Sequence, residues 1–178
     1  WRISDICVDE AGDVYVADMR NNCIHKFDSE GSFMFRWGHA GGGSGEFLET
    51  GGITVDSHGF VYVVDVGNNR IQKFDSKGNF LQQWNSWLSS DSSLAGRFIS
   101  PRDITVDREG YIVVVDSDSR YKYDSYSRIT KFASDGKLID EWEKPECEGW
   151  SIASNSHADI YMSDMTGTLY SIHKYRQD

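Results

Sequence analysis

The segment Gly52–Trp84, GITVDSHGFVYVVDVGNNRIQKFDSKGNFLQQW, decides the fold of this chain. It holds four short apolar runs, and the residues between them are rich in Gly, Asn and Asp, which favour turns. Apolar runs of this length between turn residues predict strands, and four in succession predict a four-stranded antiparallel meander. Partial copies of the segment make up the rest of the 178-residue chain.

The copies are recognised by polar residues at fixed positions. The residue that closes the first strand recurs at intervals of 47, 51 and 48 residues, and the one that closes the second strand follows nine residues later. A period of about 45 residues with four strands predicts a β-propeller, in which each sheet is one blade. We therefore expect an all-β, single propeller region with blades at 3–38, 52–85, 103–143 and 151–178, the last incomplete. The two sets of closing residues are Asp9, Asp56, Asp107 and Asn155, and Asp18, Asp65, Asp116 and Asp164.

The motifs of the second copy resemble the NHL repeat. They are Gly-Ile-Thr-Val-Asp at 52–56, Val-Tyr-Val-Val-Asp at 61–65 and Gly-Asn-Asn-Arg-Ile-Gln-Lys-Phe at 67–74. The resemblance extends over nearly the whole chain, although the third copy has an enlarged loop and the fourth departs from the pattern. Propellers of this family usually have six blades, so the resemblance implies that these four are part of a six-bladed ring, with further blades or domains in the full-length protein.

Two classes of function follow from the NHL resemblance. Such propellers often serve as recognition ends of larger proteins, which implies a non-catalytic scaffold for a protein or peptide partner. Related propellers include lyases and metal-dependent lactonases with a divalent cation in the central channel. The matching positions here are Asp5, Gly52, Asp103 and Ser151. Asp5 and Asp103 are therefore the candidate ligands for Ca²⁺, a cation that prefers oxygen donors. The sequence contains no evident nucleophile–base pair.

Charge argues against nucleic acid as the partner. The formal net charge is −10, and the long inter-strand segments with their flanking turns sum to −5. Binding RNA, as some NHL propellers do, requires cations that neutralise phosphates, so RNA is disfavoured unless further blades carry basic charge. The chain has no apolar run near the roughly 18 residues of a membrane span. Its three cysteines and five histidines show no paired spacing, so neither a disulfide framework nor a zinc site is predicted.

The long segments identify the face expected to bind. The first and third connections of each blade are tight turns, whereas the segments Gly38–Gly51, Asn85–Arg102, Ser117–Arg128 and Glu143–Trp150 all emerge at the other end of the strands. Insertions gathered on one face of a repeat array usually mark the binding face. Two of these segments carry aromatic and cationic residues of the kinds found at binding hot spots. These candidate partner-binding residues, which could instead pack the loops onto the blades, are Trp87, Phe98, Arg120, Tyr121, Lys122, Tyr123, Tyr126 and Arg128.

The repeated aspartates are expected to be structural. Asp9, Asp18, Asp56 and Asp65 lie where strands end and turns begin, and a carboxylate there accepts hydrogen bonds from backbone N–H groups two residues on. The glycines of the tight turns are not a phosphate-binding loop, because no helix follows them.

Overall fold

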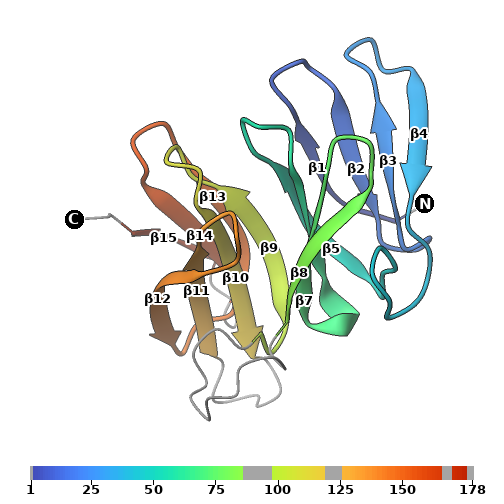
Figure 1. The fold of residues 1–178 in the computed structure, drawn as a ribbon. Coiled ribbons are helices and arrows are strands. Elements are labelled where there is room, and N and C mark those ends of the chain that lie inside the picture. Colours follow the sequence, from blue (N-terminus) through green and yellow to red (C-terminus); the bar gives the residue numbers. More distant parts are fainter. Residues whose placement is uncertain (1, 86–97, 119–125, 166–169, 176–178) are drawn as a thin grey trace. The chain divides into compact units, whose positions relative to one another are not determined.

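A computed structural model of the chain describes residues 2–85, 98–118, 126–165 and 170–175. The described residues form antiparallel sheets in series, each a meander of consecutive strands (Figure 1). The expected all-β, propeller-type architecture is thus confirmed. Among the described segments, none forms a helix with the length and hydropathy needed to cross a lipid bilayer.

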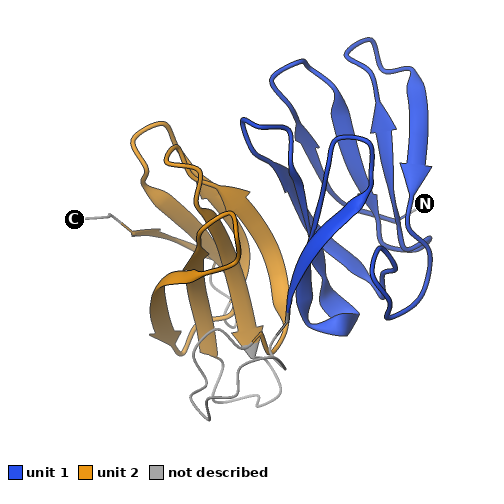
Figure 2. Ribbon diagram, viewed as in Figure 1, with its two compact units in different colours: residues 1–84 blue, residues 85–178 orange. Residues whose placement is uncertain are grey.

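The chain divides into two compact units, residues 1–84 and 85–178, which Figure 2 colours separately. Unit 1 contains blades 1 and 2. Blade 1 consists of β1 (Ile3–Val8), β2 (Val14–Asp18), β3 (Cys23–Phe27) and β4 (Phe33–Trp37). Blade 2 consists of β5 (Thr50–Val55), β6 (Val61–Asp65), the short 3₁₀ turn η1 (Val66–Asn68), β7 (Arg70–Phe74) and β8 (Phe80–Asn85).

Unit 2 contains blades 3 and 4. Blade 3 consists of β9 (Pro101–Val106), β10 (Ile112–Asp118), β11 (Tyr126–Phe132) and β12 (Leu138–Pro145). Blade 4 has three described strands, β13 (Gly149–Ser154), β14 (Ile160–Asp164) and β15 (Ser171–Tyr175).

Each unit has its own apolar core between its two sheets. In unit 1, Tyr15, Ala17 and Ile24 of blade 1 pack against Val63 and Phe74 of blade 2. Successive strand residues point to opposite faces, so Cys23 and His25 of β3 lie on the face of blade 1 away from this core. The core of unit 2 is built in the same way. It consists of Val113, Val115, Ile129, Cys147, Ile152, Ile160 and Met162.

The residues that close the first strands act as expected. Asp56 Oδ1 accepts the backbone N–H groups of His58 and Phe60, at 2.9 and 3.0 Å. Asp9 and Asp107 accept the equivalent pairs of N–H groups, and Asn155 does the same with its amide oxygen. A single side chain thereby completes each tight turn.

The residues that close the second strands differ between blades. Asp18 accepts the backbone N–H of Asn21 in the following turn at 3.1 Å, as expected. In blades 2 and 3 the equivalent carboxylate binds another part of the blade. Asp65 Oδ1 accepts the N–H of Leu48, and Asp116 accepts the N–H of Ser100. These donors lie in the segment that leads into the first strand of the same blade. The carboxylate therefore fixes the long connection, rather than only the turn that follows it.

Both ends of the segment Ser117–Arg128, which the sequence indicated to be an enlarged loop, belong to strands. β10 continues to Asp118 and β11 begins at Tyr126, with Ser117 paired to Ser127. The hydroxyls of these two serines lie 2.9 Å apart, and each can donate its single proton to a backbone carbonyl at the junction with blade 4, Ser117 to Gly149 and Ser127 to Cys147. Because these small buried side chains are satisfied by backbone groups of that junction, the hairpin extends past them and Arg128 lies within a strand.

Candidate functional site

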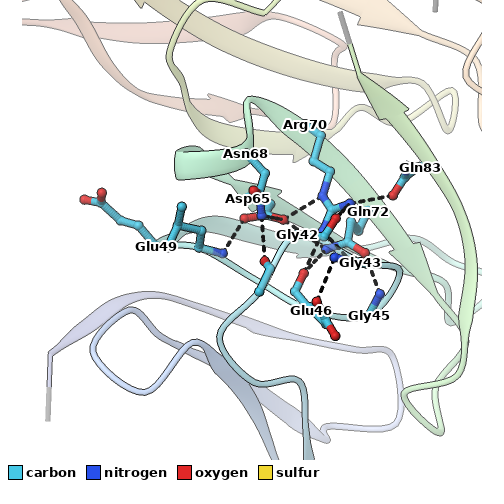
Figure 3. Close-up of polar contacts among 12 residues, drawn as sticks. Gly42, Gly43, Gly45, Glu46, Glu49, Asp65, Asn68, Arg70, Gln72 and Gln83 are labelled. Atoms are coloured by element: carbon cyan, nitrogen blue, oxygen red, sulfur yellow. Dashed lines mark hydrogen bonds and ion pairs between the residues drawn. The ribbon is translucent and has the colours of Figure 1, made fainter. Parts of the chain in front are cut away.

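The longest of the fully described connections is Gly38–Gly51, which joins blades 1 and 2. Arg70 at the start of β7 holds it in place. The guanidinium Nε donates to Asp65 Oδ2 at 2.7 Å, Nη1 donates to the carbonyl of Gly42, and Nη2 donates to the carbonyls of Gly43 and Glu46 (Figure 3). All three nitrogens of the planar guanidinium therefore donate hydrogen bonds. A buried cation thus fixes the backbone of this glycine-rich loop.

Two glutamines complete this network. Gln83 Oε1 accepts a hydrogen bond from Arg70 Nη1 at 2.7 Å. Gln72 donates from Nε2 to the Glu46 carbonyl at 2.7 Å and accepts the Gly45 N–H with Oε1 at 2.9 Å (Figure 3). Asp65 and Arg70 are both almost completely buried, so the ion pair is screened little by solvent. The long-loop end of blade 2 is therefore a preorganised surface.

Next to this loop lies an open depression of about 490 Å³, which we call the long-loop depression. Its volume falls in the range of ligand-binding clefts, roughly 300–1,000 Å³. It contains two arginines, one glutamate and two flexible apolar side chains. The lining residues are Arg2, Met19, Arg20, Asn22, Leu48 and Glu49.

Hydrogen bonds fix the backbone of two lining residues, Leu48 and Glu49. The N–H of Glu49 donates to Asn22 Oδ1 at 2.7 Å, which joins the β2–β3 turn of blade 1 to the link into blade 2. Asn22 and Glu49 both have positive φ, 52° and 64°. The Leu48 carbonyl accepts the N–H of Gly67 at 2.6 Å. The leucine side chain is nevertheless half exposed, so an apolar group is presented on a fixed backbone.

Of the eight partner-binding candidates, five lie outside the described residues: Trp87, Arg120, Tyr121, Lys122 and Tyr123. The other three make intramolecular contacts. Phe98 is buried and its ring lies 5.7 Å from that of Phe132. Arg128 is 2% exposed, and its guanidinium pairs with Asp116 at 2.8 Å, as Arg70 pairs with Asp65. These two side chains therefore support blade 3 and are not presented to a partner.

Tyr126 is the most accessible of the three. Its hydroxyl donates to Glu143 Oε1 at 2.8 Å, from β11 to β12. Partial burial, together with this hydrogen bond, raises the pKa of the Tyr126 hydroxyl to about 12, so it remains a donor at neutral pH. The depression lies at the long-loop end of the strands in unit 1, where the sequence pattern placed the binding face, and that face stays a prediction. The pattern gave no signal for Arg2, Met19 and Leu48, which are ordinary residues brought together by the packing of two blades.

The two calcium candidates act as clamps between blades. Asp5 Oδ2 accepts the N–H of Ile53 in blade 2 at 2.7 Å. Asp103 Oδ2 accepts the N–H of Ile152 in blade 4 at 2.9 Å and the hydroxyl of Ser151 at 2.5 Å. Each carboxylate therefore joins the first strands of two neighbouring blades within its unit. Both carboxylates therefore have a structural role, and calcium binding at these positions stays a prediction.

The comparisons with known proteins agree on the fold. A family model described as a 6-bladed beta-propeller matches residues 1–95. No curated protein matches the sequence. Among solved structures, the WD40 β-propeller domain of Doa1 superimposes with a TM-score of 0.63 at 16% identity, over 98% of this chain and 51% of that one.

Two enzymes are also similar in structure. Luciferin-regenerating enzyme has a TM-score of 0.63 at 15% identity, over 92% of this chain and 53% of that one. Streptogramin B lyase has a TM-score of 0.54 at 14% identity, over 99% of this chain and 69% of that one. The chain spans about half the length of the first two structures. At such identities the likeness shows the fold alone, because one propeller architecture carries many functions.

Proposed function

We propose, because this chain belongs to a family of 6-bladed β-propellers, that it is a non-catalytic binding module whose long-loop depression takes a protein or peptide partner. The single observation that carries the proposal is the depression itself, a fixed concave surface with cationic and apolar groups side by side. Its blades are of the NHL type, a reading supported by the repeated motifs of the second copy.

The lining side chains indicate the chemistry of the partner. Arg2 and Arg20 are exposed, and a guanidinium binds a carboxylate through two parallel hydrogen bonds. Leu48 and Met19 supply the apolar contact that a neighbouring side chain of the partner would bury. A peptide with an acidic residue beside an apolar one fits this combination. On a chain of net charge −10, two arginines at one site favour an acidic group there over the surrounding surface.

Preorganisation supports binding rather than catalysis. The loop beside the depression is fixed by Arg70, so little conformational entropy is lost when a partner binds. Among the described lining residues there is no cysteine, serine or histidine, and the one carboxylate, that of Glu49, has no hydroxyl or thiol beside it in the lining for which it could act as a base.

The test begins with selection of peptides from a displayed library on the folded 178-residue chain, followed by measurement of Kd by fluorescence anisotropy. We expect enriched peptides to carry an acidic and an apolar residue. Arg20→Glu and Leu48→Asp should each weaken binding about thirtyfold, which corresponds to the roughly 2 kcal/mol of a hot-spot residue.

The matched control is Lys77→Glu, a charge reversal in the tight β7–β8 turn at the opposite end of blade 2. It should leave Kd unchanged, and circular dichroism should show that all three variants are folded. If the selected peptides bind the Arg20 and Leu48 variants as tightly as the parent chain, the depression is not the binding site.

A further inference from the structure

The position next to each second-strand aspartate differs between blades. In blades 2 and 3 it holds an arginine, and the pairs are Asp65 with Arg70 and Asp116 with Arg128. In blade 1 the residue at the position of Arg70 is Cys23, and a histidine, His25, takes the position of Gln72. The same carboxylate is thus surrounded by a thiol and an imidazole instead of a guanidinium.

The three donor groups of blade 1 converge. Cys23 Sγ lies 3.4 Å from His25 Nε2, and that nitrogen lies 3.5 Å from Asp18 Oδ2. All three donor atoms are within 4.8 Å of one another, and all three residues are buried. Zinc–nitrogen and zinc–sulfur bonds of about 2.0–2.3 Å in a tetrahedron place neighbouring donors about 3.3–3.8 Å apart. The separations of 3.4 and 3.5 Å fall in that range.

Blade 4 has the same set of donors, but its thiol comes from a different position of the repeat. His173 Nε2 lies 3.3 Å from Asp164 Oδ2, at the repeat positions of His25 and Asp18. The thiol, however, is that of Cys147, in the link between β12 and β13, and Ser171 occupies the position of Cys23. Cys23 and Cys147 occupy different positions of the repeat, so a shared ancestral repeat does not explain why both blades have a cysteine beside the Asp–His pair. An Asp–His pair alone needs no thiol, yet two of the chain's three cysteines lie beside such pairs.

We propose that the triads Asp18–Cys23–His25 and Cys147–Asp164–His173 are two binding sites for a thiophilic divalent cation, with Zn²⁺ as the best fit. One thiolate, one imidazole and one carboxylate suit Zn²⁺, which takes sulfur, nitrogen and oxygen donors in tetrahedral geometry and completes it with a fourth ligand such as water. Mg²⁺ and Ca²⁺ prefer oxygen donors alone.

The state of the thiols argues against a redox or nucleophilic role. Burial raises the pKa of Cys23, and burial together with the nearby Asp164 raises the pKa of Cys147 to about 12. A buried, protonated thiol is a poor nucleophile. A cation that binds there displaces the thiol proton and leaves a neutralised metal–thiolate group in its place. Each site would thereby replace the arginine that neutralises the aspartate of blades 2 and 3.

The test is titration of the reduced, metal-free 178-residue chain with Co²⁺, which substitutes for Zn²⁺ and gives a thiolate-to-metal charge-transfer absorption when sulfur is a ligand. We expect two equivalents to bind with this absorption, and Zn²⁺ to displace them. Cys23→Ser and Cys147→Ser should each lose one equivalent. Cys7→Ser is the matched control, since Cys7 belongs to neither triad, and it should lose none.

For Cys23 and for the two histidines, the substitutions use residues that another blade carries at the same position. Serine replaces Cys23 in blade 4, and glutamine replaces His25 in blade 2. If a serine variant fails to fold by circular dichroism, His25→Gln and His173→Gln decide the question for their sites. The proposal is overturned for both sites if the folded parent chain shows no thiolate absorption, and for one site if its variant retains both equivalents.

Discussion

Arg70→Met should destabilise unit 1 because it leaves the buried carboxylate of Asp65 without its counter-charge. Removing one partner of a buried ion pair typically costs about 3–5 kcal/mol of unfolding free energy. Asp65 keeps hydrogen bonds from the Leu48 N–H, Asn68 Nδ2 and Gln72 Nε2, so we expect the lower end of that range. The carbonyls released from the guanidinium lie in a loop at the surface, where water can hydrate them.

The assay is urea unfolding followed by far-ultraviolet circular dichroism. With a slope of about 1–3 kcal/mol/M, a loss of about 3 kcal/mol lowers the unfolding midpoint by about 1–3 M. Lys77→Met, at an exposed turn, should change the unfolding free energy by less than about 0.5 kcal/mol. In the double variant Asp65→Asn/Arg70→Met the buried charge is gone, so its loss should be smaller than the sum of the two single losses. A loss below about 1 kcal/mol for Arg70→Met would refute the reasoning.

The remaining predictions concern packing, pH and calcium. Gly149→Ala should lower the unfolding free energy of unit 2 by about 1–3 kcal/mol in the same assay, because the added methyl would lie 2.6–2.8 Å from side chains of β10 and β14. Gly42→Ala is the control. Its methyl would have no neighbouring atom closer than 3.6 Å, so the unfolding free energy should hardly change. Although partial burial raises the pKa of Asp75, its hydrogen bonds from Asn79 and the Lys77 N–H leave that pKa below its usual value. The carboxylate therefore stabilises the fold above its unfolded pKa of about 3.9. The stability difference between the parent and Asp75→Asn should shrink as pH falls below that value and on through the lower folded pKa, and a constant difference would contradict this. The Asp103 carboxylate already accepts hydrogen bonds from a backbone N–H and a hydroxyl, so Ca²⁺ should not raise the melting temperature. A rise that is lost in Asp103→Asn would show instead that this carboxylate binds Ca²⁺.

The candidate site was only partly predictable. The long connections indicated which end of the strands would carry a binding surface, and a concave surface lies at that end of unit 1. The individual lining residues could not be predicted from the sequence. Phe98 and Arg128 have the composition of a hot spot, but burial and the Asp116 ion pair give them structural roles. Composition cannot separate these outcomes, because aromatic and cationic side chains serve equally in cores and in interfaces.

The amino-acid sequence by itself determined the class of fold and the tight turns. Strand and turn preferences depend on residues only a few positions apart along the chain. Asp56, for example, binds N–H groups two and four residues further on, so this turn is encoded locally. Only the tertiary structure decided the rest. Cys147 meets Asp164 and His173 because the link into blade 4 folds back over β14, and no spacing along the chain encodes that approach. Sites built from two blades depend on contacts across tens of residues, which the three-dimensional packing alone creates.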